Sequence, residues 1–245
     1  MICKNCHHEF EGNFCSHCGQ KASVRRLDFK YLVRDVPNSV FQLNRGFFFT
    51  AKEILVRPGQ AVRNFVAGQR QPYYKPIAFL IVVSTIYILI HYFVGGYTLV
   101  EDFLLGVESG ATAQEEISDT AFAKWLTKYQ LYVPLMVLPF FSVASYLAFI
   151  KSRYNYVEHL VLNVYITAQQ FMIFMVFAFI TRNNSDWVVI PFLIGIAYVF
   201  WTYIQFFDDK KLIRKIALIL LTYVYFFIFT TVTIFAVGII IGLLQ

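Results

Sequence analysis

Residues 3–18 contain two pairs of cysteines, Cys3-Lys4-Asn5-Cys6 and Cys15-Ser16-His17-Cys18, which are separated by eight residues. Two residues between thiolates let both sulfurs of a pair reach one ion from a single tight turn, and four thiolates close a tetrahedron around zinc. About twenty residues cannot bury a core, so the bound metal must supply the fold. We therefore predict a structural zinc ribbon over residues 1–20, with these four cysteines as ligands; a dithiol redox pair and an iron site are the alternatives.

The residues around the cysteines fit this prediction. Gly19 directly follows Cys18, where a zinc-binding turn often needs positive φ. Phe10 and Phe14 lie between the two pairs, where their rings can cover the site. Three histidines are expected to be exposed neighbours rather than ligands, because four sulfurs already complete the shell: His7, His8 and His17.

The composition excludes an ordinary soluble domain. The 245 residues are 58% hydrophobic and only 15% charged, with a mean hydropathy of +0.57, whereas soluble domains average about 25% charged residues. Five apolar stretches are long enough to cross about 30 Å of hydrocarbon: 76–94, 131–150, 157–180, 187–207 and 216–244. The predicted fold class is an all-α membrane protein, with a five-helix transmembrane bundle over 76–245 and juxtamembrane amphipathic helices within 21–75.

The basic residues predict how the chain sits in the membrane. Of the 21 Lys and Arg, 18 precede the first span or lie in the second-to-third and fourth-to-fifth loops, and 3 lie on the other side. The positive-inside rule then places the N-terminus in the cytosol and the C-terminus outside the cytoplasmic membrane. All four cysteines lie in the ribbon, which fits the reducing cytosol. No signal peptide is visible, so the first span should act as its own insertion signal.

The segment 21–75 is basic and aromatic, with helical spacing over 47–56 and 60–66. Phe47, Phe48 and Phe49 are too apolar for a bare surface, while Lys52 and Glu53 argue against a full span. Two interpretations remain open: an amphipathic helix in the headgroup region, and a helical layer packed under the bundle. Nucleic-acid binding is disfavoured, because the positive charges flank spanning helices and the topology rule already explains them.

The third span carries most of the polarity within the membrane. His159, Asn163, Thr167 and Gln170 share one helical face, and Glu158 lies beside them at the cytosolic end. Gln205, near the inner end of the fourth span, is a candidate partner. His91 is not, because it lies near the outer end of the first span, whereas Glu158 and His159 lie at the inner end of the third. These residues are either interhelical hydrogen-bond partners or the lining of a ligand cavity. In the first case we expect Glu158 to pair with Arg153, Lys75 or Lys210.

Two further features have weaker signals. The segment 95–130 is external in this topology and carries six acidic residues, which fits a solvated loop or, alternatively, a cation site. Gly238 and Gly242 form a G-x-x-x-G pair, a spacing that favours close helix contact within the bundle or between protomers.

The order of several short motifs resembles a known family. Arg57-Pro58-Gly59 and Gly68-Gln69-Arg70 precede Tyr74-Lys75-Pro76, and Tyr156-Val157-Glu158-His159-Leu160 opens the third span. Together with the two cysteine pairs, this arrangement resembles an uncharacterised family of bacterial multi-spanning proteins, a domain of unknown function with an N-terminal zinc ribbon. The resemblance implies an integral membrane protein and supplies no activity.

The sequence predicts a function class rather than a reaction. We find no phosphate-binding loop, nucleophile elbow, zinc-protease motif or dinucleotide fingerprint. A closed metal shell favours a non-enzymatic adaptor or regulatory protein whose ribbon docks a cytosolic partner. The alternative is a transporter or ligand-binding bundle that uses the polar face of the third span. An intramembrane enzyme would have only Glu158 and His159 as acid and base.

Overall fold

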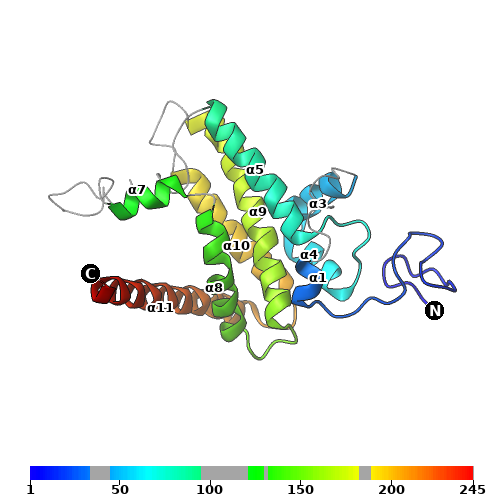
Figure 1. The fold of residues 1–245 in the computed structure, drawn as a ribbon. Helices are drawn as coiled ribbons and strands as arrows, with labels where there is room; N and C mark the ends of the chain where they lie inside the picture. Colours follow the sequence, from blue (N-terminus) through cyan, green and yellow to red (C-terminus); the bar gives the residue numbers. More distant parts are fainter. Residues whose placement is uncertain (34–44, 95–120, 130–131, 182–188, 245) are drawn as a thin grey trace.

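The computed structural model describes residues 1–33, 45–94, 121–129, 132–181 and 189–244, and within these ranges the chain forms helices and no β-strand (Figure 1). This confirms the all-α class. The helices are α1 (Phe29–Val33), α3 (Arg45–Val56), α4 (Pro58–Ala67), α5 (Pro76–Val94), α7 (Ala121–Lys128), α8 (Tyr132–Ala148), α9 (Tyr156–Thr181), α10 (Val189–Phe206) and α11 (Leu212–Leu244). The acidic segment predicted as a loop or cation site lies mostly outside the described residues.

The central helix is α9, which packs against α5, α8 and α10 (Figure 1). Its side chains at Val161, Leu162 and Ala168 are completely buried. Apolar side chains that are buried on several faces of one helix need neighbouring helices on each of those faces. The third predicted span therefore forms the core of the bundle.

Among the described residues, four helices are long and apolar enough to cross a membrane: α5, α9, α10 and the first two-thirds of α11. The prediction of several spanning helices is thus confirmed. α8 has 17 residues, or about 25 Å of helix, and is shorter than the predicted span 131–150. It ends early because the chain turns after Ala148, where the Ser152 N–H donates to the Phe149 carbonyl at 2.7 Å. A fifth crossing therefore stays a prediction.

α11 packs mainly against α8 and less against α10. In Figure 1 it diverges from α5 and α9 toward the C-terminus. Large apolar side chains along it are exposed: Leu220, Val224, Phe227, Ile228 and Val232. Such a surface requires lipid or another helix to cover it.

α3 and α4 form a short layer at the C-terminal end of α10. Pro58 occupies the first turn of α4, and Gly68 ends the helix in the left-handed conformation with φ 112°. Gly59 lies directly against α10: a Cβ there would be 2.4 Å from the Phe206 nitrogen and 2.5 Å from the Thr202 oxygen. Only glycine allows the two backbones to approach this closely.

Two tyrosine hydroxyls connect this layer, and the segment between α4 and α5, to the spanning helices. Tyr198 donates to the Ile54 carbonyl at 2.6 Å, and Tyr165 donates to the Tyr74 carbonyl at 2.7 Å. The inner face of α3 and α4 is buried, whereas Phe48 and Leu55 are more than half exposed. The two interpretations of this segment therefore describe two faces of one structure, an inner face packed on the bundle and an outer apolar face.

Candidate metal centre and buried polar sites

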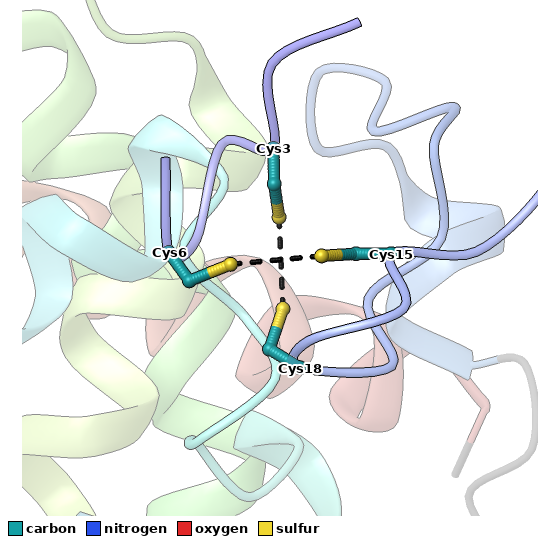
Figure 2. A group of neighbouring side chains, drawn as sticks. All are labelled: Cys3, Cys6, Cys15 and Cys18. Carbon is teal, nitrogen blue, oxygen red and sulfur yellow. Dashed lines mark hydrogen bonds between the residues drawn. The ribbon is translucent and has the colours of Figure 1, made fainter. Parts of the chain in front are cut away.

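The four predicted ligand cysteines converge on one point (Figure 2). All four sulfur atoms lie within 4.8 Å of one another, and the Cys3–Cys18 and Cys6–Cys15 pairs are each 3.6 Å apart. A tetrahedral ion with metal–sulfur bonds of about 2.3 Å separates its sulfurs by about 3.8 Å. The cluster therefore has the dimensions of a four-thiolate metal site with no open position.

The two cysteine pairs form equivalent turns twelve residues apart. The Cys3 N–H donates to His8 O at 3.0 Å, and the Cys15 N–H donates to Gln20 O at 2.8 Å. Isolated β-bridges flank both turns, joining Ile2 to Glu9 and Phe14 to Lys21. Each turn thus presents two sulfurs from the same backbone geometry, as two zinc-binding turns do.

The equivalence extends to the residue after each second cysteine. Gly19 has φ 73°, as the sequence predicted, and its counterpart His7 has φ 59°. The left-handed region is rarely adopted by a residue with a Cβ. His7 therefore occupies a position suited to glycine, a feature that the pattern of cysteines alone did not reveal.

The thiols differ in how readily they lose their protons. The pKa of Cys3 is lowered to about 7, chiefly because the Cys6 backbone N–H points toward its sulfur. The pKa of Cys6 is raised to about 12. The His8 backbone N–H lowers this pKa, but the loss of hydration and the neighbouring thiols together raise it by more. A metal ion must displace every thiol proton, so metal binding and the loss of these protons are coupled.

The ribbon is attached to the helical layer through Gln20. Its side-chain oxygen accepts from the backbone N–H groups of Arg70 at 3.0 Å and Gln71 at 3.3 Å, and Gln20 is buried. Arg70 continues the connection by donating to the Arg25 carbonyl at 2.8 Å and covering the Tyr31 ring at 4.4 Å. The Gly68-Gln69-Arg70 motif therefore lies where the ribbon meets α4.

Glu158 caps the N-terminus of α9. The Asn155 N–H donates to Glu158 Oε2 at 2.8 Å, and the Glu158 N–H donates to Asn155 Oδ1 at 2.9 Å, which is a capping box. Arg26 pairs with both carboxylate oxygens at 2.9 and 2.8 Å. The prediction that Glu158 pairs with Arg153, Lys75 or Lys210 was wrong. The chain before α1 crosses the start of α9 and brings Arg26 to this carboxylate instead.

His159 and Asn163 are buried in contacts between α8, α9 and α10. His159 Nδ1 lies 2.9 Å from Ser145 Oγ. The Asn163 amide donates to Ser142 Oγ at 3.1 Å and accepts from the Tyr203 hydroxyl at 2.7 Å. Hydrogen bonds between helices thus use most of the polar capacity of Asn163. The three hydroxyl partners were missed because serine and tyrosine are common in apolar helices and gave no periodic signal.

The other predicted residues lie apart from this network. Thr167 and Gln170 are half-buried, and Gln170 lies beside Gly195 of α10. Gln205 is close to Gly59 of α4, and its Oε1 is buried with no hydrogen-bond partner among the described residues. His91 packs on the Tyr87 ring at 4.4 Å near the far end of α5. Gly238 and Gly242 lie in the last turns of α11.

Comparison with known proteins gives a match to one family model over part of the chain, and no activity. Residues 44–88 match the family model described as a protein of unknown function, DUF3667. The matched stretch contains α3, α4 and most of α5, including Arg57-Pro58-Gly59 and Tyr74-Lys75-Pro76. The match and the apolar helices confirm the resemblance to an uncharacterised family of membrane proteins. No curated protein and no solved structure matches the chain.

Proposed function

We propose that this membrane protein is an adaptor that holds a zinc ribbon on the cytosolic side as a docking surface for a partner protein. The observation that carries the proposal is the attachment of the four-cysteine module. Buried Gln20 fixes it to the loop before α5, while most of its other side chains are exposed. A small module fixed to a bundle at one side is suited to presenting its free sides to another molecule.

Zinc is the metal that the ligand set favours. Four thiolates in two tight turns match structural zinc sites, and the closed shell leaves no coordination position for a substrate. When bound, the ion supplies the folding free energy that a segment of this size lacks. The residues of the ribbon then serve recognition rather than catalysis.

The exposed apolar residues of the ribbon suggest where a partner would bind. Ile2 and Phe14 occupy equivalent positions in the two turns and are 65% and 56% exposed. The Lys21 ammonium lies 5.9 Å above the Phe14 ring. A partner with an apolar contact surface and acidic neighbours would complement this face.

The orientation rests on charge and on thiol chemistry. The side that carries 18 of the 21 basic residues also carries the four cysteines. Lys and Arg near spanning helices are retained in the cytosol, and thiolates persist there in reduced form. A partner for the ribbon would therefore be cytosolic.

Transport, the alternative function, has less support. A cavity along the third span would need free polar groups on one face of α9. Asn163 instead bonds to Ser142, Ser145 and Tyr203, and Ser145 also contacts His159. These bonds are what interhelical stabilisation would produce.

Capture of cross-linked partners from intact cells tests the adaptor proposal. The full-length chain is compared with Phe14→Ser, with Ile2→Ser and with the matched ribbon variant Glu11→Gln. We expect the same partner to be captured by the parent chain and by Glu11→Gln and to be lost from both apolar variants. Equal capture by all four proteins, each retaining its metal, would contradict the proposal.

A further inference from the structure

A small basic pocket lies where α8 ends and α11 begins. Its volume is about 230 Å³, and it is lined by Ala148, Phe149, Ile150, Lys151, Lys210, Arg214 and Leu218. This is more space than a single bound ion requires, since one water occupies about 30 Å³. The pocket is separate from the ribbon and from the Asn163 network.

The pocket combines two chemistries. Lys151, Lys210 and Arg214 contribute three cationic groups, whereas Ala148, Phe149 and Leu218 contribute an apolar wall. A free inorganic anion would use only the cations. A molecule with an anionic head and an apolar body would use both parts of the lining.

Nearby carboxylates leave much of this positive charge uncompensated. Lys210 donates to Asp209 at 2.8 Å, and the same contact lowers the pKa of Asp209. Asp208 pairs with Arg63 at 2.7 Å and lies 3.7 Å from Arg153. Within the described ranges, no ion pair involves Lys151 or Arg214. These two cations are therefore available to an anion.

The surroundings of the pocket are suited to a membrane interface. Ile150 and Ile213 are 57% and 84% exposed, next to Lys151 and Arg214 in the chain. In the proposed orientation this end of α8 and α11 lies at the cytosolic surface of the bilayer. Apolar side chains would then face acyl chains while the adjacent cations lie at the level of the lipid headgroups.

We propose that this pocket binds the phosphate-bearing headgroup of an anionic membrane lipid. Arg214 and Lys151 would bind the phosphate, since guanidinium and ammonium groups are its usual partners. The apolar wall would contact the glycerol and the first part of the acyl chains. The inference rests on the proposed membrane orientation and is independent of any partner of the ribbon.

Lipid retention measured by native mass spectrometry tests the site. The purified full-length protein in nonionic detergent receives equal amounts of phosphatidylglycerol and phosphatidylcholine. We expect selective retention of phosphatidylglycerol, reduced by about fivefold for each cation removed in Lys151→Gln and Arg214→Gln. The exposed neighbour Lys211 lies outside the lining, so Lys211→Gln should retain lipid like the parent, and Arg214→Lys should retain most of it.

Three outcomes would overturn the proposal: equal retention of both lipids, unchanged retention in the Lys151→Gln/Arg214→Gln double variant, or retention of millimolar glycerol phosphate by a protein that retains neither lipid. The last outcome would indicate a site for a soluble phosphate rather than a lipid. The ribbon is intact in every variant, so partner capture should be unaffected. Failure here is therefore distinguishable from failure of the adaptor proposal.

Discussion

Arg26 and Glu158 lie 132 positions apart in the sequence and form a two-pronged ion pair, with Nε to Oε1 at 2.9 Å and Nη2 to Oε2 at 2.8 Å. Only 4% of the Glu158 side chain is exposed, compared with 59% of the Arg26 side chain. The contact raises the pKa of Arg26, chiefly through its hydrogen bond to Glu158. The segment that follows the ribbon is thus fixed to the first turn of the central helix.

Replacing Arg26 by Met should destabilise the folded protein. The buried Glu158 carboxylate would lose its two charged donors and keep the Asn155 N–H. We expect a loss of about 1–3 kcal/mol in the free energy of unfolding, measured by denaturation of the purified protein in detergent. Arg25→Met is the matched control, because that side chain is also exposed and forms no ion pair among the described residues. Equal stability of the two variants would show that the ion pair contributes nothing.

Gly59→Ala should also destabilise the protein, for a steric reason. The new Cβ would meet the backbone of α10 at 2.4 Å, so α4 would have to move away. Overpacking of this kind costs about 1–3 kcal/mol. Gly195→Ala on α10 is the control, because its Cβ would first meet Gln170 Nε2 at an ordinary 3.6 Å, and it should be neutral or slightly stabilising. A neutral Gly59→Ala would mean that α4 does not lie on α10.

His7→Gly should strengthen metal binding. The left-handed conformation at φ 59° costs a residue with a Cβ about 1 kcal/mol more than it costs glycine. Folding of the ribbon and metal binding are coupled, so the gain should appear as roughly fivefold tighter zinc affinity in competition with a chelator. Gly19→Ala should weaken binding by a similar factor. Equal affinities for all three proteins would refute the equivalence of the two turns.

Asn163→Leu separates interhelical bonding from a cavity role. The variant loses bonds to Ser142, Ser145 and Tyr203. The free energy of unfolding in detergent should therefore fall by about 1 kcal/mol per bond. Gln170→Leu lies on the same face but is half-buried and should lose less. Retained stability of Asn163→Leu, together with a lost cellular phenotype, would instead favour a ligand cavity.

The cysteine spacing predicted the sulfur cluster because two-residue separation constrains the local backbone directly. Hydropathy predicted the class because a span needs a long apolar run. Neither the cysteine spacing nor the hydropathy could predict that Glu158 pairs with Arg26, because that contact depends on how the chain before α1 folds back. The contact at Gly59 was likewise hidden: a glycine in a Pro-Gly pair predicts a turn, whereas here it lies in a helix that packs on α10.

The length of α8 shows the same limit. The apolar run continues through Phe149 and Ile150, so composition predicted a helix to residue 150. The structure ends the helix at Ala148 and turns Phe149 into the core, where its ring stacks on Phe207 with centroids 3.9 Å apart. Tertiary packing, rather than local propensity, decided where this helix stops.

Thiol labelling in cells tests the central claim most directly, because the chain has four cysteines and all of them are in the ribbon. A membrane-impermeant maleimide is applied to spheroplasts, to permeabilised spheroplasts and to permeabilised spheroplasts treated with a zinc chelator. A cytosolic ribbon that holds its metal predicts little labelling in the first two samples and four labels per chain in the third. Full labelling of intact spheroplasts, or of permeabilised ones without chelator, would contradict the account.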